Sequence, residues 1–248
     1  MLKDSQTTAF ILAAGRGERM RPLTDTCPKP LLNVRGKALI DWHIDALASA
    51  GFNQLVINTA WLGQKFLAHF HGESSLMSKQ YMGKQLSISY SHEGDDFGEA
   101  LETAGGIARA LPMLGDVFWV LAGDVFTPDF AFDPAAIERF NASTMLAHLW
   151  LVPNPPHHPK GDFGLGADGL ALNLPPGSMQ PSYTFSTIAL YRKAFFATLP
   201  SGNPQGIKAP LAPLLRAAMD NQRVSAELYS GAWTDVGTPE RLAELNQP

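Results

Sequence analysis

The sequence predicts an α/β protein with a Rossmann-like, mixed but mainly parallel sheet and helices on both faces. Short apolar segments of strand length alternate with segments of helical periodicity through the first half of the chain. Such alternation is typical of a parallel sheet with covered faces. The chain has 248 residues, 45% of them hydrophobic and 17% charged, which is enough for a substantial core. We therefore expect a single domain over residues 1–248.

The first apolar segment, residues 10–12, ends in a stretch with the features of a phosphate-binding loop. Gly15 and Gly17 let the backbone approach a ligand and adopt positive φ, so that successive N–H groups converge on phosphate oxygens. Residues 16–29 contain four basic and two acidic side chains, whereas the whole chain has a net charge of −4. A surface turn with solvated charges is the alternative. A dinucleotide fingerprint is disfavoured, because Met20 stands where the third glycine of GxGxxG is required.

The next elements continue the alternation. A helix is expected over 38–50, because Ile40, Ile44 and Leu47 share one face, and Gly51 is a natural residue to end it. A short apolar segment precedes this helix at 31–34, and further strands are expected at 54–58, 86–90, 117–121, 146–152 and 183–191. Further helices are expected through Phe66 and Phe70, before Leu111, and over 209–221.

The most apolar predicted strand, 117–121, is followed by Gly123 and Asp124. In open α/β sheets, ligands bind outside the carboxyl ends of the strands, so Asp124 is expected to face that crevice. It is the strongest single candidate for a metal ligand. An aspartate that caps the following segment is the alternative.

Gly105 and Gly106 are expected at the start of the helix that ends near Leu111. The free N–H groups of a helix N-terminus suit an anion or a ribose hydroxyl. A plain turn into a helix is an equally good interpretation of these residues alone.

Residues 153–163 are rich in proline and cannot form a central strand. We expect a loop that leads into a hairpin centred on Asp168 and Gly169. His157 and His158 suggest a metal site, but adjacent residues rarely face one ion, so solvated loop histidines are the favoured interpretation.

Near the end of the chain, a strand from Tyr229 is expected to turn at Asp235 into a closing helix. Thr238 is the expected cap of that helix and Pro239 its first residue. By these residues alone, Asp235 could simply anchor the turn.

Composition excludes several classes of protein. A net charge of −4 argues against nucleic-acid binding. The N-terminus has no apolar run of signal-peptide type, and no uncharged apolar stretch approaches the roughly 18 residues of a membrane span, so we expect a cytoplasmic protein without membrane contact. The single cysteine, Cys27, permits neither an internal disulfide nor a cysteine-based metal site.

The loop after the first strand resembles the signature of the sugar-1-phosphate nucleotidylyltransferases. The match runs from Gly15 to Thr24 in the pattern GxGxRMRPxT and continues in Pro28-Lys29-Pro30. Later matches are Thr103-Ala104-Gly105, Gly123-Asp124 and the segment Trp233-Thr234-Asp235-Val236-Gly237-Thr238-Pro239. The resemblance covers essentially the whole chain and implies a GT-A-like fold with a smaller sugar-binding β subregion. It implies a nucleotide-binding half over about residues 1–127 and a sugar-binding half over about 128–248.

The resemblance also implies roles for individual residues. Arg16 and Lys29 are the expected catalytic residues, and Asp124 and Asp235, 111 residues apart in the sequence, are the expected ligands of Mg²⁺. Asn154 and Asp162 are expected on the sugar side. The expected nucleotide-binding residues are Leu12, Ala13, Ala14, Gly15, Gly17, Thr103, Gly105 and Gly106.

The implied reaction joins UTP to a sugar 1-phosphate and releases pyrophosphate. The sugar phosphate that the resemblance favours is N-acetylmuramate 1-phosphate, a substrate in peptidoglycan recycling. Together, two such substrates have about five or six negative charges. A loop with a net charge of +2 cannot hold them without a divalent cation. The family tends to have glycine where this chain has Thr187 and Ala189, which makes the identity of the sugar the least determined point.

Other interpretations stay open. Within the family, the product could be a guanylyl, thymidylyl or cytidylyl sugar, with glucose or mannose as the sugar. A non-catalytic nucleotide-sugar-binding regulatory subunit is disfavoured because the expected metal and phosphate ligands are present, and a Rossmann oxidoreductase is disfavoured by Met20. No hexapeptide repeat is visible, so we expect a stand-alone catalytic domain that is a monomer or a weak homodimer.

Overall fold

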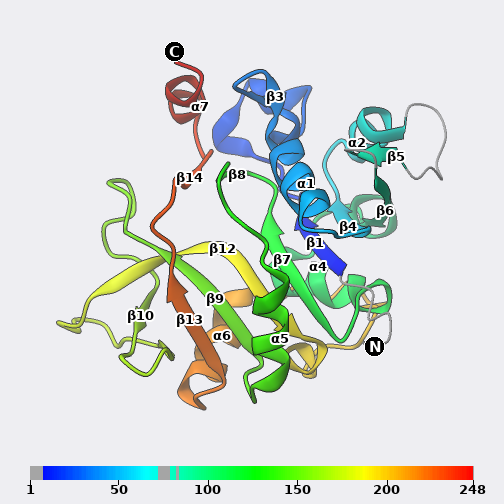
Figure 1. The fold of residues 1–248 in the computed structure, drawn as a ribbon. Coiled ribbons are helices and arrows are strands. Elements are labelled where there is room, and N and C mark those ends of the chain that lie inside the picture. Colours follow the sequence, from blue (N-terminus) through cyan, green and yellow to red (C-terminus); the bar gives the residue numbers. More distant parts are fainter. Residues whose placement is uncertain (1–7, 72–78, 82–83, 248) are drawn as a thin grey trace.

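A ten-stranded sheet forms the centre of the protein (Figure 1). The computed structural model describes residues 8–71, 79–81 and 84–247. Four strands lie side by side and parallel, in the order β7, β1, β4, β6. They comprise β1 Thr8–Leu12, β4 Gln54–Thr59, β6 Lys84–His92 and β7 Val117–Ala122, with β5 Lys79–Tyr81 antiparallel at the outer edge of β6. The mixed, mainly parallel sheet that the sequence predicts is confirmed.

The second half of the chain extends this sheet through one long, antiparallel strand. That strand is β12, Ser182–Arg192, whose second half pairs with β7 and whose first half pairs with β10. Strand β9 lies along its other edge. The remaining strands of the sheet are β9 Ala147–Val152, β10 Phe163–Leu165, β11 Ala171–Leu172 and β13 Val224–Leu228. Two short ribbons lie outside the sheet. One pairs β2 Asn33–Val34 with β3 Lys37–Ala38, and the other pairs β8 Val125–Phe126 with β14 Thr234–Asp235.

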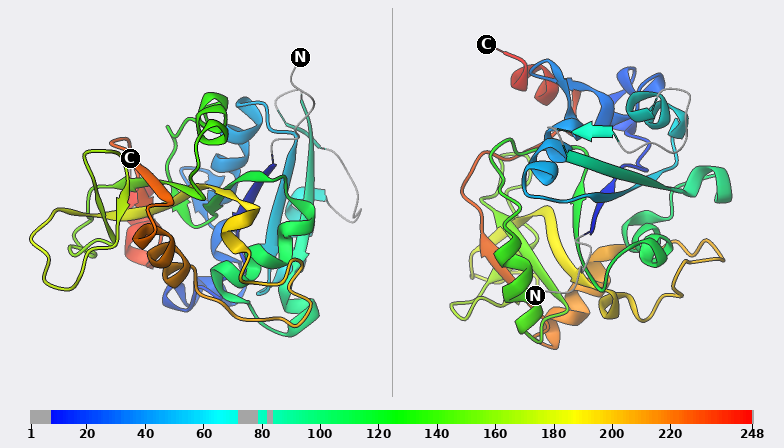
Figure 2. Two further views of the ribbon diagram at one scale, coloured as in Figure 1. Left: turned by 90° about the horizontal axis from the view of Figure 1, so that it is seen from below. Right: turned by 45° about the vertical axis from the view of Figure 1, so that its right-hand side comes forward.

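Helices cover both faces of the sheet, as the views in Figures 1 and 2 show. On one face lie α1 Leu39–Ser49, α2 Gly63–His71 and α5 Pro134–Ala142, and on the other lie α4 Glu102–Ala110 and α6 Leu211–Asp220. The short helices are α3 Glu93–Phe97 and α7 Pro239–Leu245. Single turns of 3₁₀ helix lie at Glu18–Met20, Leu23–Asp25, Lys29–Leu31, Leu111–Met113 and Lys193–Phe196.

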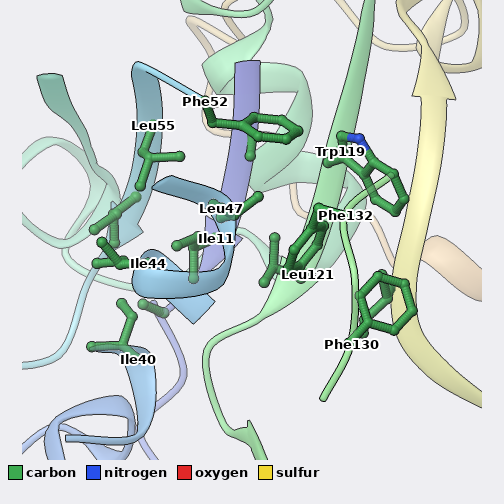
Figure 3. Packing of buried hydrophobic residues seen from close by; sticks show 14 of the residues in the cluster. Ile11, Ile40, Ile44, Leu47, Phe52, Leu55, Trp119, Leu121, Phe130 and Phe132 are labelled. Atoms are coloured by element: carbon green, nitrogen blue, oxygen red, sulfur yellow. The ribbon is translucent and has the colours of Figure 1, made fainter. Parts of the chain in front are cut away.

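Consecutive residues of the central strands belong to two different cores. In β1, Phe10 packs with the core under α4 and α6, whereas Ile11 packs with the core under α1. This follows from the pleat, which points neighbouring side chains to opposite faces. Figure 3 shows the second core, in which Ile40, Ile44 and Leu47 of α1 face the strands. Strands buried on both faces explain why these segments are continuously apolar.

Local signals set several element ends. Helix α1 ends at Ser49, and Gly51 follows with a φ of 95°, as the sequence predicts. Thr238 caps α7 and Pro239 opens it, also as predicted. The hairpin at Asp168 and Gly169 joins β10 to β11.

The last expected strand and helix α5 differ from the sequence-based expectation. The strand expected from Tyr229 lies at 224–228 as β13, and only the two-residue β14 falls within the expected segment. Tyr229 follows β13 directly: its N–H still donates to the Leu151 carbonyl at 2.7 Å, and its ring packs edge-on against Phe130, with ring centroids 5.2 Å apart. Helix α5 is not among the predicted elements, although Asp133 caps it and Pro134 begins it. Within the described residues, no helix is both long and apolar enough to cross a membrane.

Candidate active site

One cavity of about 670 Å³ lies at the carboxyl ends of the parallel strands. Its walls come from the loop after β1, the end of β4, the segment after β7, the start of α4, and β12. Among the residues predicted for the site, those that line it are Leu12, Ala13, Ala14, Gly15, Lys29, Thr103, Asp124 and Asp162. The other predicted residues, Arg16, Gly17, Gly105, Gly106, Asn154 and Asp235, lie outside this lining.

The loop over 13–17 is anchored at its ends and open in its middle. The carbonyl of Leu12 accepts a hydrogen bond from the backbone N–H of Gly123 at 2.8 Å. Gly17 has a φ of 67°, and its carbonyl accepts a hydrogen bond from the Thr24 hydroxyl at 2.8 Å. A Cβ on Gly15 would meet no atom within 4 Å. The loop therefore presents open backbone at Gly15, as a phosphate-binding loop requires.

The side chain of Arg16 points away from the cavity lining, to the flank of the loop. Its guanidinium donates to the Thr24 carbonyl at 2.8 Å and to Asp25 at 2.9 Å. The same guanidinium stacks on the ring of Trp61, 3.7 Å from its centroid. Arg21 also pairs with Asp25, and hydrogen bonds from Arg21 and Arg16 lower the pKa of that carboxyl. Arg16 is thus held by three groups at the flank of the loop.

Lys29 and Asp124 meet in the wall of the cavity. The Lys29 Nζ lies 2.5 Å from Oδ2 of Asp124, and the Lys29 side chain is 13% exposed. Asp124 follows β7, and Lys29 begins the 3₁₀ turn Lys29–Leu31. The residue predicted to hold a phosphate and the residue predicted to hold a metal are therefore direct neighbours.

The short ribbon of β8 and β14 brings Asp235 next to Asp124 along the backbone. Val236 N–H donates to the carbonyl of Asp124 at 2.9 Å, and Asp235 is paired with Val125. The Oδ1 of Asp235 lies 2.5 Å from Arg241 and 2.7 Å from His157. The fold thus joins two segments far apart in sequence, and each carboxylate has a cationic or titratable neighbour.

The glycines of α4 serve close packing. Helix α4 starts at Glu102, so Gly105 and Gly106 lie inside it rather than at its mouth. A Cβ on Gly105 would come within 2.5 Å of the Ile207 carbonyl. The N–H groups of Ala104 and Gly105 both donate to the Ala209 carbonyl, at 2.9 and 3.1 Å. These N–H groups are therefore already hydrogen-bonded within the protein, in contrast to the free N–H groups expected at a helix N-terminus. Thr103, by contrast, lines the cavity.

The two residues predicted on the sugar side differ in position. Asp162 lines the cavity, and its Oδ2 accepts the Phe185 N–H at 2.8 Å. Asn154 instead ties the proline-rich loop to β12, because it accepts from the Thr184 hydroxyl and donates to the Ser182 carbonyl, both at 2.9 Å.

The two loop histidines contact site carboxylates. His157 contacts Asp235 at 2.7 Å, and His158 lies 3.1 Å from Asp162. Their side chains are 39% and 42% exposed, so the expected solvation is only part of their environment.

Sequence reasoning missed several residues of the cavity wall. Asn58 and Glu93 are buried polar residues that line it, at the ends of β4 and β6. The signal for both was the one that identified Asp124, a polar side chain at or directly after the end of a buried strand. Thr187, which the sequence already connects with the identity of the sugar, also lines the cavity, with a φ of 67° in a bulged part of β12. Other lining residues that the sequence did not predict include Phe185, Tyr191, Pro210, Leu211, Ala212 and Leu215.

The cavity thus combines open loop backbone, a partly buried ammonium and carboxylates. Such a set is suited to binding and aligning phosphate groups rather than to supplying a nucleophile.

Comparisons with known proteins agree with this chemistry. Residues 8–167 match the nucleotidyl transferase family. Over 246 residues, the chain is 48% identical to an N-acetylmuramate alpha-1-phosphate uridylyltransferase of Neisseria meningitidis, with 95% of each chain covered. It is 33% identical over 254 residues to a protein of the same name from Caulobacter vibrioides, covering 95% of this chain and 97% of the other. A solved structure of UDP-glucose pyrophosphorylase from Acinetobacter baumannii has the same fold, with a TM-score of 0.74 at 17% identity over 96% of this chain and 91% of the other.

Proposed function

The chain belongs to the nucleotidyl transferase family, and on this premise we propose that it transfers a uridylyl group from UTP to N-acetylmuramate 1-phosphate. The observation that carries the proposal is the 48% identity, along 95% of both chains, to an enzyme named for that reaction. The match extends beyond the nucleotide-binding segments into the part of the chain that contributes β12 and Asp162 to the cavity.

The proposed reaction is an in-line substitution at phosphorus. An oxygen of the sugar 1-phosphate attacks the α-phosphorus of UTP and forms a new P–O bond. The bond from that phosphorus to the oxygen bridging the β-phosphorus breaks, and pyrophosphate leaves with the electron pair. The products are the UDP-sugar and pyrophosphate. Because the attacking oxygen is already ionised at neutral pH, no strong general base is needed.

The residues of the cavity have complementary roles in this proposal. The backbone N–H groups of the loop from Ala14 to Gly17 bind the β and γ phosphates, and Thr103 lies on the nucleoside side. Lys29 holds the phosphate of the sugar or the α-phosphate, because its ammonium is a positive charge within the cavity wall. Arg16, stacked on Trp61, adds positive charge beside the triphosphate. Asp162 contacts the sugar.

The donor set fits a divalent cation that is shared with substrate. Asp124, between β7 and β8, and Asp235, in β14, are close along the backbone and each supplies carboxylate oxygens. Within the described residues, no group of three or more His, Cys, Asp or Glu side chains could hold a metal alone. Mg²⁺ suits two carboxylates, because it keeps several waters and binds substrate phosphates. We propose that these two residues hold Mg²⁺, which when bound neutralises charge on the phosphates.

A substrate panel tests the proposal. The four nucleoside triphosphates are each combined with the 1-phosphates of N-acetylmuramate, N-acetylglucosamine, glucose and mannose in the presence of Mg²⁺, and pyrophosphate release is measured. N-acetylglucosamine 1-phosphate is the matched control, because it lacks only the lactyl ether. We expect the highest kcat/KM for UTP with N-acetylmuramate 1-phosphate.

Other results would redirect the assignment. A different best pair would refute the substrate assignment within the family. Binding of UTP without pyrophosphate release from any pair would favour a regulatory subunit.

With these substrates, the proposed role is that of a cytoplasmic enzyme of peptidoglycan recycling, acting as a monomer or a weak homodimer.

A further inference from the structure

Two buried polar side chains join the phosphate loop to the segment on the nucleoside side of the cavity. Asn58 is 2% exposed and Glu93 is fully buried, and both line the cavity. They lie on neighbouring parallel strands, because Asn58 is in β4 and Glu93 directly follows β6. Neither has a role in the reaction as written above.

The hydrogen bonds through this pair converge on Glu93 from both sides. Ala13 N–H donates to Oδ1 of Asn58 at 2.7 Å. Nδ2 of Asn58 then donates to Oε1 of Glu93 at 2.7 Å, and Leu101 N–H donates to Oε2 of Glu93 at 2.7 Å. The backbone donor at Ala13 determines the orientation of the Asn58 amide. Glu93 consequently has to accept with both oxygens, which a carboxylate does and a carboxamide cannot.

Each end of this chain of hydrogen bonds holds a segment that touches the cavity. Ala13 begins the phosphate loop. Leu101 directly precedes Glu102 and Thr103, which both line the cavity. Glu102 has a φ of 59°. The carbonyl of Leu101 in turn accepts from Ala209 N–H at 3.1 Å. A non-glycine residue at positive φ persists only where its surroundings determine it, and the bonds on both sides of Leu101 do so.

The surrounding structure makes room for the pair. A Cβ on Gly106 would lie 2.5 Å from Oε1 of Glu93 and 3.0 Å from Nδ2 of Asn58. Burial raises the pKa of Glu93, and the hydrogen bonds from Leu101 and Asn58 oppose that rise. A buried carboxylate is expensive to keep unless it is hydrogen-bonded, so the pair is a built feature rather than an incidental contact.

We propose that Asn58 and Glu93 are positioning residues that hold the phosphate loop and the segment at 101–103 in one fixed arrangement, so that the two ends of a nucleoside triphosphate are bound as a unit. The inference rests on the proposed function, because it takes the nucleotide to span these two segments. Loss of the chain of hydrogen bonds should weaken nucleotide binding and leave the sugar side unchanged. A purely structural pair would instead lower stability without favouring one substrate over the other.

Exchanging the amide and the carboxylate between positions 58 and 93 tests the proposal. Glu93→Gln places an amide N–H against either Asn58 or Leu101, both of which are donors. Asn58→Asp places two carboxylates against each other. In the double variant, the carboxylate introduced at position 58 would accept from Ala13 N–H and from the amide introduced at position 93, and the oxygen of that amide would accept from Leu101 N–H. Every hydrogen bond and the single negative charge are then restored with the direction of one bond reversed.

The readouts are the KM for UTP, the KM for N-acetylmuramate 1-phosphate, the dissociation constant of UTP by calorimetry, and Tm. We expect each single variant to raise the KM and dissociation constant for UTP by about tenfold or more, the size of one lost hydrogen bond to a charged group. The KM for the sugar phosphate should change by less than about twofold, and the double variant should return to within about threefold of wild type.

Two results would overturn the inference alone: unchanged UTP affinity in both single variants, or a double variant no better than Glu93→Gln. If Asn58→Asp fails to fold, the comparison of Glu93→Gln with the double variant still decides. Failure of the wild-type protein to bind UTP would overturn the proposed function and this inference with it.

Discussion

Lys29 Nζ lies 2.5 Å from Oδ2 of Asp124 in the wall of the cavity. The contact joins a cation proposed to hold a substrate phosphate to a carboxylate proposed to hold Mg²⁺. Both groups are partly shielded from water, with side-chain exposures of 13% and 35%, so their mutual attraction is stronger than that of a solvated surface pair. In the proposed site, a metal ion and Lys29 would compete for one carboxylate, and this competition would make the roles of the two residues separable by mutation.

Asp124→Asn should lower kcat by about 10²- to 10³-fold, equivalent to about 3–4 kcal/mol of transition-state stabilisation. Asparagine keeps an oxygen for Lys29 but loses the charge that attracts a divalent cation. The check is steady-state pyrophosphate release over a range of Mg²⁺ concentrations, with circular dichroism to verify the fold. Turnover close to that of wild type would mean that the ion is held elsewhere.

Lys29→Ala should raise the KM for the sugar 1-phosphate by more than about tenfold, while the KM for UTP changes less. The variant also frees Asp124, so the apparent affinity for Mg²⁺ should increase. Initial-rate measurements in which each substrate and Mg²⁺ are varied in turn give all three quantities. An equal loss for both substrates would contradict the proposed role of Lys29.

Asp235→Asn should also lower kcat by about 10²-fold or more, because it removes the second carboxylate of the proposed metal site. Asp45→Asn is the matched control: Asp45 pairs with Lys37 in a contact of 2.6 Å that does not involve the cavity. The control should keep its kcat within about twofold of wild type. If both substitutions act alike, the effect of the first is not due to the metal site.

Thr187 is a β-branched residue at a φ of 67°, where its Oγ1 donates to the Ser186 carbonyl at 2.5 Å. Left-handed backbone costs such a residue about 1–2 kcal/mol, whereas glycine pays only about 0.4–1 kcal/mol in unfolded-state entropy. We therefore expect Thr187→Gly to have the highest Tm and wild type the next highest. Thr187→Val should have the lowest Tm, because it keeps the strain and loses the hydrogen bond.

Because Thr187 lines the cavity, Thr187→Gly should also change the KM for the sugar 1-phosphate and leave that for UTP unchanged. Calorimetric scans and kinetics on the three proteins test both statements. A change confined to UTP would place Thr187 away from the sugar.

His43 predicts a pH dependence of stability. It is 1% exposed, its Nε2 lies 2.7 Å from the Val125 carbonyl, and burial lowers its pKa from 6.5 to about 4. Between these values the unfolded chain binds a proton that the folded protein does not, so stability falls as the pH falls from 6.5 towards 4. The expected loss from this group is about 3 kcal/mol.

Urea denaturation across this pH range measures the loss, with His43→Gln as the control, since glutamine can donate to Val125 but does not titrate here. The slope of unfolding free energy against pH should be smaller in the variant. Equal slopes would show that His43 binds its proton equally well in both states.

Local patterns predict much of this protein correctly. Continuous apolar segments identify strands buried on both faces, and the spacing of Ile40, Ile44 and Leu47 identifies α1. These predictions succeed because burial and turn chemistry act over a few residues. The phosphate loop is similarly local, since Gly15 and Gly17 are close in sequence and each needs only its own backbone freedom.

Predictions about side-chain partners are less complete. The sequence identifies Arg16 as a candidate for the triphosphate, but it does not reveal that the guanidinium lies against Trp61 and Asp25. It also assigns free N–H groups to Gly105 and Gly106, but these glycines make room for a backbone carbonyl and for Glu93. In each case the partner comes from another segment, so no short pattern contains the information.

The sequence alone determined the class of fold, the family and the positions where charge and glycine gather, because these depend on neighbouring residues. Only the tertiary structure decided which of those positions share a cavity. Asp124 meets Lys29, Asp235 is brought alongside by pairing of β8 with β14, and Asn58 meets Glu93 because β4 and β6 are adjacent. The physical reason is that strand pairing and burial of both sheet faces set distances between residues that the linear chain leaves free.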